Sequence, residues 1–488
     1  MARVLEIAND LVWGAPALVL ILGTGLYFSI RTRFAQLRLL PAALKRFAQS
    51  FASGNRDEGI SPFQALCTAL AATVGTGNLV GVAGAIALGG PGSIFWMWVC
   101  ALLGMMTKFV EATLAVRFRY EQNGECRGGP MYIICHGLGP GMRFLARVYA
   151  LLGVFAAFGV GTATQINALI TGAHQAAACF GVEMSAREDL LLGAALAVLV
   201  GICLAGGAKR IAGTAELLVP LVSCAYLALC VWVLILRMDA VPAALASIFR
   251  GAFSPRAVTG GVVGSVIRTL RIGVSRGVFT NEAGMGTASI AHASAKVSHP
   301  CQQGLMGIVE VFLDTVVICT MTALVILCSG VSVPYGTDAG GALTVAAFSA
   351  VCGEWVAVFL AAALCCFAFA TVLGWGLYGS ECFRFLFGDS GRKWYVFAQS
   401  AMVIAGAVMG TGTVWSLAEL MNGLMAIPNL IALVSLRRTV CSLTSEYDKL
   451  RGSFAAGGTY ENFDQCKPLS ALSHAQVPSL RAGGQETG

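Results

Sequence analysis

The chain has 488 residues, of which 57% are hydrophobic and 12% carry a formal charge, and its mean hydropathy is +0.76. An average soluble domain is roughly 45–50% apolar and about 25% charged. This composition excludes a disordered or fibrous chain and an ordinary cytosolic enzyme, and it leaves the lipid bilayer as the solvent. The net charge of +7 need not indicate nucleic acid, because basic residues of membrane proteins gather in cytoplasmic loops.

Apolar runs bounded by charges, prolines or glycine clusters predict eleven membrane-spanning helices, since each crossing takes about 20 residues. The chain is therefore expected to be an all-α polytopic membrane protein. Beyond about Val440 it is polar, rich in Ser and Gly and without periodicity, which predicts an irregular tail. The expected spans are residues 10–30, 62–87, 93–116, 147–174, 190–206, 213–236, 258–292, 304–330, 354–379, 394–410 and 413–436.

Lysine and arginine predict the orientation of these spans. If the N-terminus is outside, 24 of the 32 basic residues lie on the cytoplasmic side, five lie on the opposite side and three lie within the seventh span. Cytoplasmic loops of membrane proteins carry an excess of Lys and Arg. We therefore expect a multi-pass protein of the cell membrane with its N-terminus outside and its C-terminus cytoplasmic.

Two spans contain stretches that do not suit a continuous helix. Residues 75–78 read Gly-Thr-Gly-Asn, and residues 280–284 read Thr-Asn-Glu-Ala-Gly. Close packing through small residues would explain the glycines, but buried Asn and Glu need polar partners. Unwound backbone at membrane depth is tolerated where it is buried in protein or lines an aqueous cavity. Its free N–H groups suit a carboxylate, and its free carbonyls suit a small cation.

The two interrupted spans occupy equivalent places in the chain. Without the first helix, spans two to six and spans seven to eleven form two groups of five, and each group opens with its interrupted helix. Because five is odd, the second group crosses the membrane with opposite polarity, as in an inverted-repeat secondary transporter. We divide the chain into residues 1–60 (first helix and basic linker), 61–238 and 239–438 (the two repeats) and 439–488 (polar cytoplasmic tail).

A set of longer motifs follows in order along most of the chain, at residues 74–78 with 81–83, 87–92, 95–98, 107–109, 128–132, 276–284 with 290–293, 314–315 with 319–324, and 422–430. This ordered set resembles the alanine/glycine:cation symporter family. The resemblance implies a leucine-transporter-like fold of five plus five inverted helices preceded by one extra helix. It also implies inward symport of a small neutral amino acid, alanine or glycine, with Na⁺ as the co-transported ion, and neither enzymatic activity nor a cofactor.

Carried over position by position, the resemblance places the substrate site at the two interruptions. Thr76, Gly77 and Asn78 are expected to meet the substrate carboxylate and sodium. Asn281, in the other interrupted helix, is expected to face the substrate. Gln165 matches a polar position of the fourth span. Amide oxygens such as those of Asn281 and Gln165 suit the substrate ammonium group.

The resemblance also implies a sodium site made of Gly75, Asn78 and Thr371. The family usually has two adjacent threonines in the ninth span, whereas Ala370 stands beside Thr371 here, which would weaken that site if the missing hydroxyl were a ligand. Trp375 follows in the same span. A bulky aromatic residue above a small cavity would exclude larger side chains, so we include Trp375 among the substrate residues.

Several interpretations stay open at this point. The alternative function is a proton-coupled carrier, or a channel, for another small solute, although a channel needs rings of groups from several subunits. Glu282 is either a functional carboxyl group or a hydrogen-bonded one that holds the interruption open. Lys108 and Glu111, one helical turn apart, are expected to form a local ion pair. The expected partners are the lipid bilayer, a small neutral amino acid and Na⁺, with a monomer or weak oligomer as the assembly.

Overall fold

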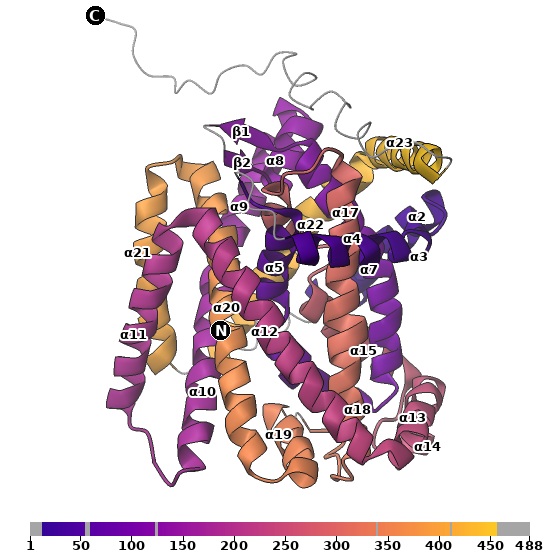
Figure 1. Ribbon diagram of the computed structural model, residues 1–488, viewed down its shortest axis with the longest axis vertical. Coiled ribbons are helices and arrows are strands. Elements are labelled where there is room, and N and C mark those ends of the chain that lie inside the picture. The colour runs from indigo at the N-terminus through magenta and orange to yellow at the C-terminus, as the bar shows by residue number, and fades with distance from the viewer. Residues whose placement is uncertain (1–11, 54–58, 123–124, 338–339, 410–411, 456–488) are drawn as a thin grey trace, which may run out of the picture.

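The computed structural model describes residues 12–53, 59–122, 125–337, 340–409 and 412–455. These residues are almost entirely helical, and most of the long helices run together as one bundle (Figure 1). Two short antiparallel strands, paired Tyr120 to Arg127, form a hairpin at one end of the bundle (Figure 1).

The elements of the first half are α2 (Ala15–Arg31), α3 (Ala35–Arg38), α4 (Leu40–Ser53), α5 (Pro62–Thr73), η1 (Gly77–Gly81), α6 (Val82–Gly89), α7 (Ser93–Arg117), β1 (Tyr120–Gln122), β2 (Glu125–Arg127), α8 (Pro130–Tyr132), η2 (Ile133–Gly137), η3 (Pro140–Met142), α9 (Arg143–Phe158), η4 (Gly159–Ala163), α10 (Thr164–Ala178), α11 (Ala186–Ala205) and α12 (Gly207–Leu236). The second half contains η5 (Met238–Ala240), α13 (Val241–Phe253), α14 (Pro255–Val258), α15 (Val266–Asn281), α16 (Thr287–Ala293), α17 (Pro300–Val311), η6 (Phe312–Cys319), α18 (Thr320–Cys328), α19 (Gly340–Cys352), α20 (Trp355–Phe387), α21 (Gly391–Val408), α22 (Gly412–Ser435) and α23 (Arg437–Ala455).

A helix, or a run of consecutive helices, lies at each of the eleven predicted spans. Within the described ranges, six helices are long and apolar enough to cross a bilayer, and eight are if each of two bent pairs counts as one span. Two of the predicted spans contain shorter helices, because α2 has 17 residues and α15 has 16. The predicted all-α membrane architecture is therefore present, with several spans built from short or interrupted helices.

The first interruption lies where the sequence predicted it. Helix α5 ends at Thr73, Val74 is extended (φ −77°, ψ 109°), and helical structure resumes at Gly77. The two arms are bent by 52° relative to each other. The resumed segment η1 is a π-helix, a rare geometry that occurs frequently at functional sites.

The second interruption is sharper. Helix α15 ends at Asn281, and the next residue, Glu282, has a left-handed backbone (φ 52°). Gly284 (φ 97°) and Gly286 (φ 80°) follow in conformations that only glycine adopts without strain, and α16 begins at Thr287. Five residues of non-helical backbone, 282–286, are thus buried inside the bundle.

The expectation of an irregular tail from Val440 is wrong for the residues that the structure describes, because α23 continues to Ala455. Val440, Thr444 and Tyr447 are buried on one face of this helix. Their spacing of four and three residues is that of a helical stripe, which the polar average of the segment concealed. Residues 456–488 of the predicted tail lie outside the described residues.

Candidate functional site

The two interruptions approach each other at positions that carry little or no side chain. A Cβ atom added at Gly77 would lie 2.9 Å from Cγ2 of Thr280, at the end of α15. On α7, a Cβ atom added at Gly104 would lie 3.1 Å from Cβ of Ala283. The absence of side chains at Gly77 and Gly104 therefore lets the first interruption and α7 pack directly against the second interruption.

The Asn78 side chain stabilises the first interruption through hydrogen bonds. Its Oδ1 accepts a hydrogen bond of 2.8 Å from the Gly75 N–H, which closes the turn between α5 and η1. Its Nδ2 donates to Oδ1 of Asp314 (2.8 Å) and to the Asp314 carbonyl (3.1 Å) in η6. Asn78 is fully buried, and its amide forms hydrogen bonds that stabilise this turn and connect it to η6.

The same π-helical segment η6 reaches the second interruption. Thr315 Oγ1 donates to Oδ2 of Asp314 (2.8 Å), and Asn281 Nδ2 donates to Thr315 Oγ1 (3.3 Å). Asn281 Oδ1 in turn accepts from the Ala283 N–H (3.0 Å). One buried chain of hydrogen bonds therefore links Asn78 to Asn281 through Asp314 and Thr315.

A small cavity of about 20 Å³ lies between the interruptions. A cavity needs roughly 10–15 Å³ to hold one water molecule, so an amino acid requires these elements to move apart. Six of the eight residues predicted for the site line this cavity, namely Gly75, Thr76, Gly77, Gln165, Thr371 and Trp375. The other two, Asn78 and Asn281, do not line it and belong to the hydrogen-bond chain.

The hydroxyl of Thr371 lies where α5 and α20 come into contact. Its Oγ1 is 2.9 Å from the carbonyl oxygens of Ala71 and of Phe367. A Cβ atom added at Gly75 would lie 3.0 Å from the same Oγ1. Hydroxyl and carbonyl oxygens thus gather at the end of α5, and such hard oxygen ligands suit an alkali cation.

Gln165 and Trp375 form other parts of the cavity wall. Thr76 Oγ1 donates to Gln165 Oε1 (3.4 Å), and Gln165 Nε2 donates to the Val160 carbonyl in η4 (3.2 Å). A Cβ atom added at Gly161 would lie 2.3 Å from Cβ of Trp375. The segment η4 therefore packs closely against α20 at this point, and the Trp375 side chain lies buried at the cavity wall.

Asn422 of α22 also lines the cavity, and its role was not predicted from the sequence. It is almost completely buried, and within the part of the chain that the structure describes its Oδ1 has no hydrogen-bond partner. A buried acceptor without a donor is costly and suits a ligand that brings one. The signal in the sequence was an Asn within an apolar run, which periodicity alone does not distinguish from packing.

The backbone of the second interruption is held by side chains from neighbouring helices. Glu111 Oε1 accepts from the N–H groups of Gly284 (3.0 Å) and Gly286 (3.1 Å). It also accepts from Nδ2 of Asn429 on α22 (2.7 Å). The free N–H groups that this interruption was expected to offer a ligand are therefore taken, at these two glycines, by a carboxylate of the protein itself.

The predicted ion pair between Lys108 and Glu111 is wrong. Lys108 Nζ binds Oε1 of Glu310 on α17 (2.9 Å), whereas Glu111 turns to the amides of the second interruption. Nε2 of His292 lies 2.8 Å from the other oxygen of Glu310. The spacing along α7 alone could not show this, because both partners come from other helices.

Glu282 lines the cavity, and Thr287 Oγ1 donates to its Oε2 (2.6 Å). Its carboxyl group therefore both contacts the cavity and stabilises the start of α16. The two interpretations of Glu282 drawn from the sequence are thus compatible in geometry.

The chain is similar to known membrane transporters over most of its length. The profile of the sodium:alanine symporter family matches residues 1–458. The sodium/alanine symporter AgcS of Methanococcus maripaludis is 42% identical over 451 residues, which cover 91% of this chain and 96% of that protein. The probable sodium/glutamine symporter GlnT of Bacillus subtilis is 38% identical, covering 92% of this chain and 91% of its own.

A solved structure supports the fold independently. The transporter MhsT in complex with L-phenylalanine has a TM-score of 0.57 and 16% identity, covering 78% of this chain and 90% of its own. At that identity the likeness shows the fold alone, which is the leucine-transporter fold that the family resemblance implied. Together with the full-length family match, these findings show that the chain is a multi-pass membrane transporter that belongs to the sodium:alanine symporter family.

Proposed function

We propose that the protein carries a small neutral amino acid, alanine or glycine, inward together with Na⁺ by alternating access. The observation that carries this proposal is the small cavity between the two interruptions. Peptide groups, hydroxyl and amide oxygens, the Glu282 carboxyl group and the side chains of Phe279 and Trp375 line it. A zwitterion can be held in such a dry site only if both of its charged ends are paired.

The groups at the cavity match the two ends of a zwitterion. Peptide N–H groups at residues 76–77 and a bound Na⁺ suit the carboxylate. Oδ1 of Asn422 and Oε1 of Gln165 suit the ammonium group, since both are acceptors at the wall. Na⁺ is assigned to the oxygens around Thr371, next to Gly75, with Asn78 holding that turn.

The size of the cavity favours a small side chain. Trp375 and Phe279 close the wall, so a longer substrate requires a larger displacement of packed helices than alanine does. The relative GlnT, 38% identical, is named a probable sodium/glutamine symporter, so the proposal of a small substrate rests on the small cavity of this chain and not on its relatives.

Coupling follows from the shared elements. The first interruption contributes both to the substrate cavity and to the oxygens around Thr371, so Na⁺ and the amino acid favour the same arrangement of α5 and η1. Each ligand then raises the affinity for the other by the same factor. Because one polypeptide supplies both interruptions, we propose that a single chain is the transporting unit, as a monomer or a weak oligomer.

A proton-coupled carrier is the second candidate, because the carboxyl group of Glu282 also lines the cavity.

The distribution of Lys and Arg supports an orientation in the cell membrane with the N-terminus outside and the C-terminus cytoplasmic. Relative to that orientation, inward transport brings the substrate toward the C-terminal end of α20.

The deciding experiment is uptake of labelled alanine into proteoliposomes, with glycine, serine and glutamine as competitors. Uptake that requires an inward Na⁺ gradient and fails when Li⁺, K⁺ or choline replaces Na⁺ is the expected result. Uptake that ignores Na⁺ and follows a pH gradient would establish the proton-coupled carrier instead. Stronger competition by glutamine than by glycine would contradict the assignment of a small substrate.

A further inference from the structure

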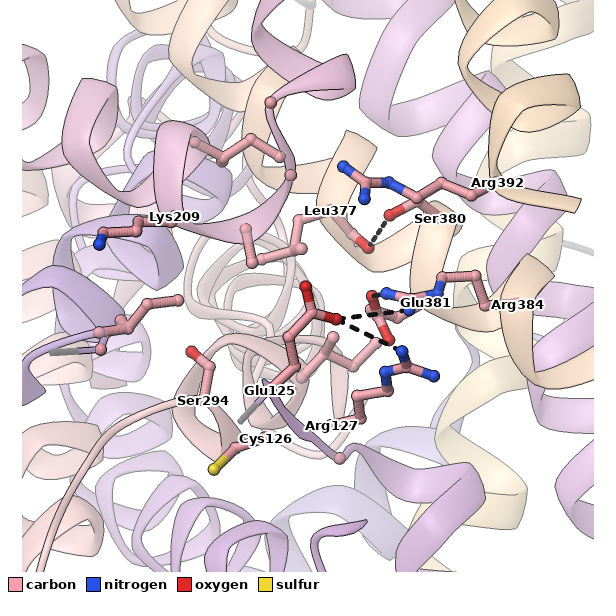
Figure 2. Close-up of a pocket in the computed structure, with 18 of the residues that line it drawn as sticks. Glu125, Cys126, Arg127, Lys209, Ser294, Leu377, Ser380, Glu381, Arg384 and Arg392 are labelled. Atoms are coloured by element: carbon pink, nitrogen blue, oxygen red, sulfur yellow. Dashed lines mark hydrogen bonds and ion pairs between the residues drawn. The ribbon is translucent and has the colours of Figure 1, made fainter. Parts of the chain in front are cut away.

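A second and larger pocket lies near the C-terminal end of α20. Its volume is about 220 Å³, and β2, the N-terminus of α12 and α20 contribute to its wall. Figure 2 shows Glu125 and Arg127 of β2 beside Glu381 and Arg384 of α20, with Lys209 on another side of the pocket. By the proposed orientation this pocket belongs to the cytoplasmic half of the protein.

The pocket and the central cavity follow one another along the same elements. On α20, Trp375 lines the central cavity and Leu377 lines the larger pocket. At α5, Thr73 lines the central cavity, and Ile60, just before the helix, lines the larger pocket. Between α15 and α16, Glu282 lines the central cavity, and Ile290 of α16 lines the larger pocket. The larger pocket therefore lies beyond the central cavity along these three segments, toward the C-terminal end of α20.

Charged side chains of both signs line the pocket in close contact. Arg384 Nη1 binds Oε1 of Glu381 at 2.8 Å, and Nη2 of Arg384 lies 3.4 Å from Oε2 of Glu125. Arg127 also reaches Glu125, at 3.4 Å (Figure 2). Arg384 and Arg127 further bind Asp389, at 2.7 and 3.0 Å, but Asp389 does not line the pocket.

Two buried polar atoms of this cluster lack partners among the described residues. They are Oε2 of Glu381, on a side chain that is 91% buried, and Nε of Arg127, on a side chain that is 88% buried. One is an acceptor and the other is a donor. Most buried polar groups in proteins are satisfied, so an unpaired acceptor and an unpaired donor in one pocket point to a ligand with both functions.

We propose that this pocket is a second binding site for the transported amino acid, occupied after the substrate leaves the central cavity. The ammonium group binds Oε2 of Glu381, and the carboxylate binds Arg127. Lys209, Lys296 and Arg392 line the same pocket and leave an excess of positive charge, which favours the carboxylate. This inference rests on the function proposed above, because it requires the cargo to be a zwitterion.

The test measures equilibrium binding of labelled alanine to the purified full-length protein, with and without Na⁺. We expect the wild type to bind one equivalent that requires Na⁺ and a second equivalent that does not. Glu381→Gln should weaken the Na⁺-independent equivalent by about tenfold or more, since a charge-assisted hydrogen bond is lost, and should keep the Na⁺-dependent one. Asp389→Asn is the matched control, because it removes a carboxylate from the same arginines outside the pocket wall.

Analogues with one charged end decide which ligand chemistry the pocket accepts. Propionate and ethylamine should each compete poorly for the Na⁺-independent equivalent. Competition by propionate equal to that by alanine would overturn the proposal, because the pocket would then bind any carboxylate. A wild type without Na⁺-independent binding, or a Glu381→Gln variant that binds like wild type, would also overturn it.

Cys126 supplies a measurement that does not depend on a variant that folds. It lines the pocket and is half-buried, so bound alanine should slow its alkylation by iodoacetamide in Na⁺-free buffer. Alkylation at an unchanged rate would contradict occupation of the pocket. Na⁺-driven uptake without Na⁺-independent binding leaves the proposed transport function intact and removes only this inference. Na⁺-independent binding without Na⁺-driven uptake would instead contradict the proposed symport function.

Discussion

Asn78 and Asn281 lie at opposite ends of one buried chain of hydrogen bonds, with Asp314 and Thr315 between them. Each asparagine also accepts from a backbone N–H of its own interruption, at Gly75 and Ala283 respectively. We therefore expect the conformations of the two interruptions to be coupled through η6. A ligand that changes one of them changes the hydrogen bonds available to the other, which is the physical requirement for coupled binding.

Asp314→Asn should uncouple the two interruptions. The carboxylate accepts from Asn78 with one oxygen and from Thr315 with the other, whereas an amide offers a single acceptor oxygen. One buried donor then loses its acceptor, at a cost of about 1–3 kcal/mol. We expect a lower thermal unfolding midpoint in detergent and Na⁺-driven alanine uptake reduced about tenfold or more.

The matched control for this change is Asp239→Asn, at an exposed position before α13. It alters the same functional group away from the interruptions and should leave uptake and the unfolding midpoint unchanged. Full uptake by Asp314→Asn would show that the chain of hydrogen bonds does not couple the interruptions.

Gly77→Ala should block the close approach of the two interruptions. The added methyl group would lie 2.9 Å from Cγ2 of Thr280, which is closer than carbon atoms pack. Thr280→Ser removes that Cγ2 and keeps the hydroxyl that donates to the Gly277 carbonyl (2.9 Å). We expect Gly77→Ala to lose most alanine uptake and the double variant Gly77→Ala/Thr280→Ser to recover part of it.

The comparison of the four proteins of this double-mutant cycle measures the contact itself. Additive losses in the double variant would mean that Gly77 is needed for backbone freedom rather than for space. The surface level of each variant, measured by labelling of intact cells, separates a transport defect from a folding defect.

The positions of both interruptions could be predicted from the sequence because their signals are local. Glycines beside Asn or Glu within a 20-residue apolar run make a continuous helix unfavourable wherever the helix packs. The partners of Lys108 and Glu111 could not be predicted, since Glu310 and Asn429 come from helices far along the chain. The helix α23 was not predicted for a related reason. Its composition is polar on average, but contacts with other helices bury one face of it.

Which site residues line the cavity and which only support it also depends on tertiary structure. From the sequence, both Asn78 and Gln165 were expected to contact ligands directly, Asn78 the carboxylate and sodium and Gln165 the ammonium group. Only the arrangement of η6 shows that the Asn78 amide binds Asp314, whereas Gln165 and Asn422, whose Oδ1 has no partner among the described residues, line the cavity. Six of the twelve residues that line the cavity were thus among those expected at the site, whereas the distinction between wall and support could not be predicted from the sequence.

Trp375→Leu should widen the range of substrates. The indole is packed against Gly161 at the cavity wall, and a leucine leaves space there that η4 cannot fill without bending. We expect glutamine to compete with labelled alanine more strongly in this variant than in wild type. Trp394→Leu, at an exposed tryptophan of α21, is the matched control and should leave the competition profile unchanged.

Thr371→Ala should raise the Na⁺ concentration needed for half-maximal uptake, because it removes the hydroxyl beside the carbonyls at the end of α5. Loss of one oxygen ligand among few should cost about tenfold or more in Na⁺ affinity. With saturating Na⁺, the alanine dependence should return close to that of wild type. Thr371→Ser retains the hydroxyl and should keep the wild-type Na⁺ dependence, so equal shifts in both variants would indicate a packing role for the threonine methyl group instead.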